Sequence, residues 1–288
     1  MLKTLIKDKI ELSHKSIINE LRGYRNRPED AICEYIWNSF DAQSTTVNIN
    51  YDFINGTESA VAFGYPSLSV SDNGTGWDLS NTQTAKLFLD SQKSLHKNRF
   101  KSIPHGSKGV GRFTFYCFAS KAIWESHFNG QSYQLTLERE SLASYEIDSS
   151  KLGPTDQNGT TVRFEVDNTL LNESFFEDVL PARLLEKFAW FLIEHPEKQI
   201  NINGNPLDLN SIIKNRKEES LIIDGKTVLL DLVQWNRSLA DQENSRAYYI
   251  GNDSEEICKY PTGLNNKADD FYHSAFVRSA SFDTVLFD

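Results

Sequence analysis

A stretch between residues 34 and 43, EYIWNSFDAQ, combines two acids and an amide with large apolar side chains. On a helix of about 3.6 residues per turn, Glu34, Asn38 and Asp41 fall within a narrow angular range and project from one face. Inward-pointing carboxylate and amide groups need hydrogen-bond or metal partners, because burying them unpaired costs several kcal/mol. The spacing therefore predicts a polar stripe that can hold a ligand or a metal ion, although an exposed polar face would fit this helix equally well.

Three glycine-containing stretches could complete a site with that helix. SDNGTG, residues 71–76, is a turn after a strand in which Asp72 can accept a hydrogen bond and the glycines allow close approach to the backbone. GSKGVGRF, residues 106–113, exposes backbone N–H groups before a predicted helix, and with Lys108 it favours an anion. NGTTVRF, residues 158–164, is by itself a turn entering a strand.

The elements that would position these residues begin with a helix from Pro28 to about Phe40. Proline suits the first turn of a helix, and two acids follow it. Strands are expected at 47–51, 60–63, 68–70, 121–126, 132–138, 160–166 and 200–202, and further helices at 79–90, 112–119 and 184–192. The polar, basic stretch 91–112 is too long for an ordinary connector and is interpreted as a functional loop. This order predicts an α+β fold, a two-layer sandwich with helices on one face of a mixed, mostly antiparallel sheet.

Beyond residue 206 the strand pattern starts again. LIIDGKTVLLDLVQW and RAYYIG are two strand-like runs, and the chain ends on a third, FDTVLFD. We therefore expect one domain over residues 1–205 and the start of a small, strand-rich second domain over residues 206–288. The abrupt end suggests an N-terminal fragment or an incomplete second domain.

Composition excludes some classes of protein. The 288 residues carry a net charge of −10, which argues against a whole surface built to bind nucleic acid. Cys33, Cys117 and Cys258 show no CxxC pair and an odd count, as expected for free thiols in a reducing cytoplasm. The N-terminal residues have no signal-peptide core, and no apolar run approaches the about 18 residues of a membrane span. We expect a cytoplasmic protein with no membrane partner.

In this order, the four stretches resemble the N box, the DxGxG box, the GxxGxG lid box and the Gly-Thr strand of the GHKL ATPases, the superfamily of gyrase, the ninety-kilodalton heat-shock chaperones, histidine kinases and MutL. The resemblance spans about residues 28–166 and implies the Bergerat fold. EYIWNSFDA has the ExxxNxxDA form found in chaperones, MutL, MORC proteins and type II topoisomerases. The lid GSKGVGRF departs from the MutL pattern, which is closer to GFRGEAL, and looks nearer to chaperone-like and MORC-like members.

The resemblance implies ATP and Mg²⁺ as ligands and assigns roles to five residues. Glu34 would be the general base and Asn38 the Mg²⁺ ligand. Asp72 would accept a hydrogen bond from the adenine amino group, Gly76 would let the base lie close, and Thr160 would help to hold the adenine end.

The remaining residues of the implied nucleotide site belong mainly to the lid. The lid set, which would wrap the phosphates, is Gly106, Ser107, Lys108, Gly109, Val110, Gly111, Arg112 and Phe113. Gly74 belongs to the adenine-side turn. Asp41 is expected to brace the helix or a neighbouring loop, and Lys93 either reaches a phosphate when the lid closes or stays solvated.

Three functions remain open at this point. The first is an ATPase whose nucleotide-bound lid promotes homodimerisation, with residues after 206 sensing the γ-phosphate and with DNA clamping, chaperone action or defence against phage as possible outputs. The second is a histidine kinase, with His14 as its cue. However, only about 20 residues separate His14 from Glu34, too few for the dimerisation hairpin of such kinases. The third is a nucleotide-gated sensor with negligible hydrolysis, against which Glu34 argues.

Overall fold

The computed structural model describes residues 5–9, 14–53, 65–80, 111–142, 144–149, 153, 155–240, 243–251, 256–264 and 271–284. Within these residues the chain forms two compact units. The first extends to Pro181 and takes up the chain again at Lys198–Pro206, and the second contains Ala182–Glu197 and the chain from Leu207. The strand predicted at 60–63 and most of the helix predicted at 79–90 lie outside the described residues.

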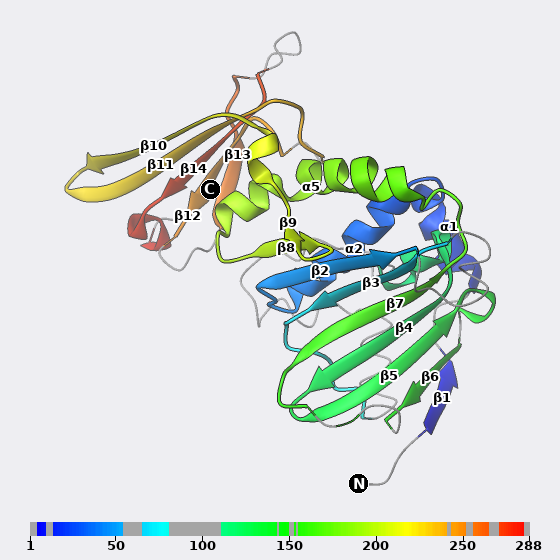
Figure 1. The fold of residues 1–288 in the computed structure, drawn as a ribbon. Helices are drawn as coiled ribbons and strands as arrows, with labels where there is room; N and C mark the ends of the chain where they lie inside the picture. The colour runs from blue at the N-terminus through cyan, green and yellow to red at the C-terminus, as the bar shows by residue number, and fades with distance from the viewer. Residues whose placement is uncertain are drawn as a thin grey trace. The chain divides into compact units, whose positions relative to one another are not determined.

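A nine-stranded sheet forms the framework of the first unit (Figure 1). Its strands are β1 (Leu5–Lys9), β2 (Thr46–Asp52), β3 (Ser67–Asp72), β4 (Ala119–Phe128), β5 (Gln131–Glu138), β6 (Ser144–Asp148), β7 (Gly159–Val166), β8 (Gln199–Ile202) and β9 (Asn205–Pro206). The strand order is β1-β6-β5-β4-β7-β3-β2-β8-β9. Strands β2 and β8 run parallel, and the other described neighbours are antiparallel.

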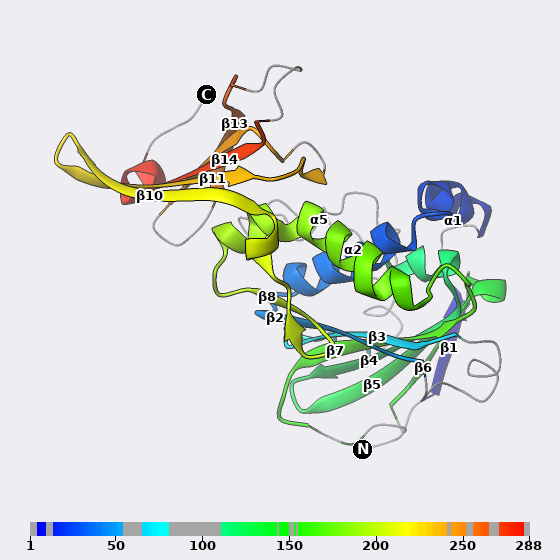
Figure 2. The same ribbon diagram turned by 45° about the horizontal axis from the view of Figure 1, so that its top comes forward.

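Helices cover one face of this sheet. Figure 2 shows α1 (His14–Leu21) and α2 (Pro28–Asp41) on the same side of the strands. The first unit also contains 3₁₀ helices at Arg22–Tyr24, Gly111–Cys117 and Arg139–Ser141 and a π-helical turn at Phe175–Val179. Along β2 and β3, alternate residues such as Ile49 and Val70 are buried, as expected for strands with one covered face. The predicted α+β fold with a mixed, mostly antiparallel sheet is confirmed.

Helix α2 starts and ends as its sequence predicts. Pro28 occupies the first turn, and the ion pair of Arg27 with Asp30, 3.0 Å long, ties the preceding residue to that turn. Most of the helix is buried, but Glu34, Asn38 and Asp41 are only half-buried. The polar stripe expected from the spacing is therefore present on an otherwise apolar helix.

The second unit contains a five-stranded sheet and most of α5 (Leu180–Glu194). Its strands are β10 (Ile213–Ile223), β11 (Lys226–Trp235), β12 (Arg246–Ile250), β13 (Glu256–Pro261) and β14 (His273–Arg278), in the order β10-β11-β14-β12-β13, with 3₁₀ helices at Leu209–Ser211 and Ala280–Thr284. Trp190 of α5 stacks on Tyr248 with ring centroids 5.4 Å apart, and Tyr248 stacks on Phe276 at 5.0 Å. These rings hold the helix against the sheet.

Several predicted elements were wrong. The helix expected at 112–119 is a 3₁₀ helix, Gly111–Cys117, because β4 already starts at Ala119 and leaves room for only a short helix. Thr114 Oγ1 donates to the carbonyls of Gly111 and Ala31 and so fixes this turn to α2. LIIDGKTVLLDLVQW is not one strand. It contains the end of β10, a turn in which Asp224 and Gly225 both have positive φ, and the whole of β11. The described part of FDTVLFD belongs to the 3₁₀ helix Ala280–Thr284. No helix in the described ranges is both long and apolar enough to cross a bilayer.

Candidate functional site

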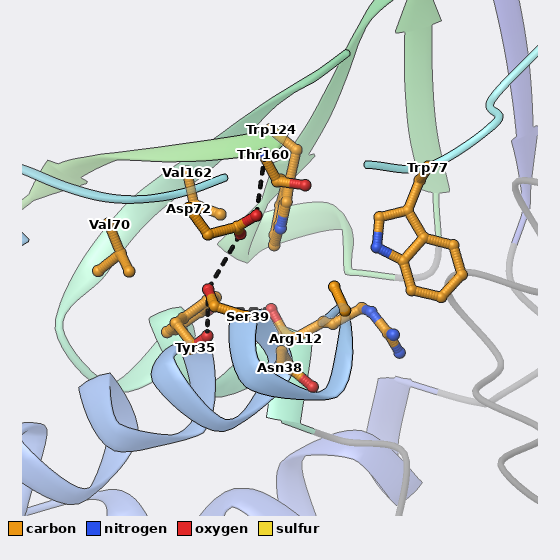
Figure 3. Close-up of a pocket in the computed structure, with 11 residues that line it drawn as sticks. Tyr35, Asn38, Ser39, Val70, Asp72, Trp77, Arg112, Trp124, Thr160 and Val162 are labelled. Carbon is orange, nitrogen blue, oxygen red and sulfur yellow. Dashed lines mark hydrogen bonds between the residues drawn. The ribbon is translucent and has the colours of Figure 1, made fainter. Parts of the chain in front are cut away.

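A pocket in the first unit brings the four sequence motifs together (Figure 3). It lies between α2, the strands β3, β4 and β7, and the start of the 3₁₀ helix Gly111–Cys117. Its lining residues are Tyr35, Asn38, Ser39, Ala42, Val70, Asp72, Trp77, Arg112, Trp124, Thr160 and Val162. Each motif contributes at least one polar side chain to this pocket: Asn38, Asp72, Arg112 and Thr160.

The carboxylate of Asp72 is held from three sides. The β3–β7 register places Asp72 opposite Thr160, and Oδ1 accepts hydrogen bonds from the backbone N–H of Gly74 at 2.8 Å and of Thr160 at 3.3 Å. Oδ2 accepts a bond from the hydroxyl of Ser39 at 3.0 Å. Burial raises the pKa of Asp72 to about 6, against the opposing effect of these donors. Asp72 is thus a fixed hydrogen-bond acceptor that titrates just below neutral pH.

The turn after Asp72 is hydrogen-bonded to the residues that connect α2 with β2. Asn73 Oδ1 accepts hydrogen bonds from the backbone N–H of Thr45 and of Thr46, both at 2.9 Å. A Cβ at Gly74 would come 2.6 Å from the carbonyl oxygen of Ala42, and Gly76 has a φ of +69°. Glycine is therefore required at both positions by close approach to the protein's own backbone and by the left-handed conformation.

Two polar atoms in the pocket are buried without a partner. Nδ2 of Asn38 and Oγ1 of Thr160 make no hydrogen bond to any residue that the structure describes. A buried, unsatisfied polar group costs roughly 1–3 kcal/mol. The side-chain amide of Asn38 can also flip, so it can present either its nitrogen or its oxygen at that point. A ligand with polar groups would satisfy both atoms.

The last glycine of the lid motif rests on the polar stripe of α2. A Cβ at Gly111 would lie 3.0 Å from Oε2 of Glu34 and 3.6 Å from Nδ2 of Asn38. The segment is anchored by Tyr35, whose hydroxyl donates to the carbonyl of Arg112 at 3.0 Å and accepts from the N–H of Phe115 at 3.0 Å. The end of the lid motif is thereby fixed against the helix that carries Glu34 and Asn38.

Arg112 brings a buried positive charge into the pocket. It is 7% exposed, and its guanidinium lies over the ring of Trp77, 5.2 Å from the centroid. Burial lowers the pKa of Arg112 to about 10, while the negative charge of Asp41 acts in the opposite direction. Arg112 therefore stays protonated at neutral pH, and Asp41 stabilises its charge.

Glu34 lies one helical turn before Asn38 and does not line the pocket. The hydroxyl of Tyr24 donates a hydrogen bond of 3.0 Å to Oε1 of Glu34. Burial, followed by the charge of Glu34, raises the pKa of Tyr24. The tyrosine hydroxyl thus remains a donor to this carboxylate.

Four of the predicted site residues that the structure describes line one pocket, namely Asn38, Asp72, Arg112 and Thr160. Gly111 lies next to Glu34 and Asn38. Phe113 is fully buried and does not line the pocket. Lys93 and the lid residues Gly106, Ser107, Lys108, Gly109 and Val110 lie outside the described residues. Sequence reasoning missed Tyr24, Tyr35, Ser39, Trp77 and Trp124. Ser39 and Trp77 directly follow Asn38 and Gly76, so adjacency was an available signal for these two. In the described ranges, no three His, Cys, Asp or Glu side chains form a group that could hold a metal ion.

Comparison with known proteins gives a family match and similarities to solved structures. The family described as histidine kinase-, DNA gyrase B-, and HSP90-like ATPase matches residues 25–168, half of the chain. Among solved structures, the chain is similar to the 43K ATPase domain of Thermus thermophilus gyrase B in complex with an aminocoumarin. The identity is 14% and the TM-score 0.44, over 92% of this chain and 83% of that one. No curated protein matches the chain.

Proposed function

The chain belongs to the histidine kinase-, DNA gyrase B-, and HSP90-like ATPases, and we propose that it binds ATP with Mg²⁺ and hydrolyses it to ADP and phosphate. One observation carries the proposal. The unpartnered atoms of Asn38 and Thr160 share a pocket with the carboxylate of Asp72, so a ligand rich in donors and acceptors is favoured there.

Adenine is the base that this pocket would select. Its exocyclic amino group is a donor and would bond to the Asp72 carboxylate, whereas guanine presents an acceptor oxygen at the equivalent position and would be repelled. The hydroxyl of Thr160 would supply a second polar contact. Val70 and Val162, together with Trp124, would pack against the faces of the base.

The phosphates would lie toward Glu34 and the lid. Mg²⁺ prefers oxygen ligands and commonly takes several from substrate phosphates, so the amide oxygen of Asn38 suits it as a protein ligand. When bound, this ion would neutralise charge that develops on the phosphates. Residues 106–111 would wrap the phosphates with their backbone N–H groups, and Lys93 is proposed to reach a phosphate when this lid closes.

Glu34 would act as the general base. A water oxygen attacks the γ-phosphorus, the bond between that phosphorus and the bridging oxygen breaks, and the electron pair stays on ADP. The Glu34 carboxylate takes the proton lost by the attacking water and then returns it to solvent or to the released phosphate. General-base catalysis of this kind contributes about 10²–10⁴-fold to a rate.

We also propose that ATP binding brings two copies of the chain together, which would drive a clamp or remodelling activity on DNA or on a protein client. Residues 206–288 would form a second, transducer-like domain. The five-stranded sheet supports this proposal, because all its strands lie between Ile213 and Arg278 and belong to a compact unit other than the one that holds the pocket.

Phosphate release and ATP binding in two variants test the function. Glu34→Gln should bind ATP but lose at least 100-fold in turnover, and Asp72→Asn should bind ATP much more weakly than the wild type. Substitution of Glu138, an exposed residue at the end of β5, by Gln is the control, and this variant should behave like the wild type.

The molar mass from light scattering, with and without a non-hydrolysable ATP analogue, tests whether ATP binding causes dimerisation. Wild-type turnover in Glu34→Gln would contradict the assigned base, and radiolabel retained on the protein from γ-labelled ATP would favour a kinase.

A further inference from the structure

Tyr24 sits in a short turn that is tied to the start of α2. The 3₁₀ helix Arg22–Tyr24 lies between α1 and α2. The backbone N–H of Arg27 donates to the carbonyl of Tyr24 at 2.9 Å, and Nη2 of Arg27 donates to the carbonyl of Gly23 at 2.8 Å. Arg27 in turn pairs with Asp30 in the first turn of α2. The tyrosine is therefore held in a defined place relative to the helix that carries Glu34.

The bond from Tyr24 fixes one oxygen of a side chain that otherwise has several rotamers. Glutamate has three side-chain torsions, and a carboxylate that must take a proton has to be held in one orientation to be effective. Oε1 of Glu34 accepts the Tyr24 hydroxyl at 3.0 Å. Oε2 points to the other side, toward Gly111, the last glycine of the lid motif. The two oxygens thus have different surroundings, since Oε1 accepts from a fixed donor and Oε2 lies next to Gly111.

We propose that Tyr24 is a positioning residue for Glu34, holding Oε1 so that Oε2 stays next to Gly111 and takes the proton from the attacking water. This inference rests on the proposed ATPase function and deepens it. Tyr24 itself touches neither ATP nor the water, and it gains or loses no proton in the step. The hydroxyl also stabilises the ionised carboxylate, because hydrogen bonds to a charged group are among the stronger ones.

The alternative role for this hydroxyl is purely structural, anchoring the turn to α2. The two roles differ in what they change. A positioning role affects kcat and leaves the affinity for ATP in place, whereas loosening of the turn and of α2 would also displace Asn38 and raise KM. A second difference is dependence on Glu34, since a positioning residue has nothing to position once that carboxylate has been removed.

The experiment is a double-mutant cycle in the full chain. Phosphate release is measured over a range of ATP concentrations, together with the melting temperature, for wild type, Tyr24→Phe, Glu34→Gln and the double variant. Tyr133→Phe is the matched control, because its hydroxyl also donates to a side-chain oxygen, that of Gln131 on β5, and neither residue lines the pocket.

Tyr24→Phe should lower kcat about tenfold and leave KM within about twofold of the wild-type value. In the Glu34→Gln background the same substitution should leave the residual rate unchanged, and Tyr133→Phe should keep wild-type kcat. The inference would be overturned if Tyr24→Phe keeps the wild-type kcat, or if it loses kcat and gains KM together. It would also be overturned if the variant unfolds, or if the substitution causes equal losses of kcat in both backgrounds. If Glu34→Gln alone retains wild-type turnover, it is the assigned general base that fails.

Discussion

Gly111 and Glu34 are packed so closely that a methyl group on the glycine would lie 3.0 Å from Oε2 of the glutamate. The contact joins the end of the lid motif to the polar stripe of α2, although the two are far apart in the sequence. Tyr35 secures it by bonding the carbonyl of Arg112, the next residue. Gly111 and Glu34 are therefore held in contact.

Replacing Gly111 with alanine should impair turnover more than stability. The nearest atom to the new methyl group is the end of a flexible side chain, so Glu34 can shift by a few tenths of an ångström at a cost of about 1 kcal/mol or less. That shift displaces the proposed base, and we expect a loss of at least about tenfold in kcat. Steady-state phosphate release and thermal melting measure the two effects.

Gly153→Ala provides the control for this substitution. A Cβ at Gly153 would meet no atom of the described residues within 4 Å. This variant should match the wild type in both measurements. An equal loss of activity in Gly111→Ala and Gly153→Ala would show that the contact with Glu34 is not the cause.

Asn38→Leu should separate ligand binding from folding. The amide nitrogen of Asn38 is buried without a partner in the described structure, so an apolar side chain of similar size removes an unsatisfied group. We expect the ligand-free protein to keep its stability or gain about 1 kcal/mol, while the thermal stabilisation by Mg²⁺ and ATP disappears.

The same substitution at Asn73 makes a matched contrast. Asn73 bonds the N–H groups of Thr45 and Thr46 and the hydroxyl of Thr45, so Asn73→Leu breaks satisfied hydrogen bonds. It should lower the melting temperature of the ligand-free protein. Strong destabilisation by Asn38→Leu, comparable with that of Asn73→Leu, would argue that Asn38 has a structural role.

The affinity for ATP should fall as the pH drops through about 6. Burial raises the pKa of Asp72 to about 6, so its carboxylate becomes protonated below that pH. A protonated carboxyl group would direct its O–H against donors, namely the Ser39 hydroxyl, the two backbone N–H groups and the adenine amino group. Below this pKa we expect up to about a tenfold loss in affinity per pH unit. Titration calorimetry between pH 5 and 8 measures it.

Asp72→Asn is the reference for that titration. Its affinity should be weak and should follow only the titration of the nucleotide phosphates, which also ionise near pH 6. If wild type and variant show parallel pH dependence, the titrating group is on the nucleotide and not on Asp72.

A second pH effect is expected from Glu194 at the end of α5. This carboxyl group is 1% exposed, and its two oxygens have no hydrogen-bond partner among the described residues. Burial, followed by the charge of Glu256, raises the pKa of Glu194 to about 8, although Arg278 and Lys259 oppose the shift. The folded state therefore holds a proton that the unfolded chain releases at lower pH.

The sign of the stability change follows from that difference. The protonated carboxyl favours the folded state, and its contribution is complete below the usual glutamate pKa and declines as the pH rises toward 8, by a few kcal/mol in total. Glu194→Gln should flatten this decline in a denaturant titration series from pH 5 to 8. Glu219→Gln, an exposed residue of β10, should leave it unchanged. A decline that persists in Glu194→Gln would assign it to the other buried carboxyl groups whose pKa burial raises, Glu256 and Asp72.

Local signals predicted the parts of the fold that local chemistry determines. Proline and two acids fix the start of α2, alternation fixes β2 and β3, and the spacing of Glu34, Asn38 and Asp41 gives the polar stripe. The pocket could be anticipated because each motif has glycine or carboxylate chemistry of its own. Two of the donors to Asp72 could not be anticipated, because the N–H of Thr160 is placed by the β3–β7 register and the Ser39 hydroxyl by the packing of α2.

The missed elements depend on partners far away in the sequence. Strand β14 lies between β11 and β12 and is buried continuously from His273 to Phe276, so it lacks the alternation of a half-exposed strand. Strand β1 pairs with β6, and the paired residues Leu5 and Asp148 are far apart in the sequence. Tyr24 lies in a 3₁₀ turn, where no periodicity connects it with Glu34. The Asp224-Gly225 turn, in contrast, had a local signal that the continuous apolar run obscured.

The path of the chain between the two units bears on how the protein can be made. The chain enters the second unit at Ala182, returns at Lys198 to add β8 beside β2 and then β9, and departs again at Leu207. During synthesis, the nine-stranded sheet therefore cannot be completed until α5 and the following residues to Pro206 have left the ribosome. A truncated chain that ends before residue 198 lacks β8 and β9 at the edge of that sheet. A truncated chain that ends at residue 206 keeps α5 but lacks Tyr248, on which Trp190 stacks. Neither unit can be excised at a single peptide bond.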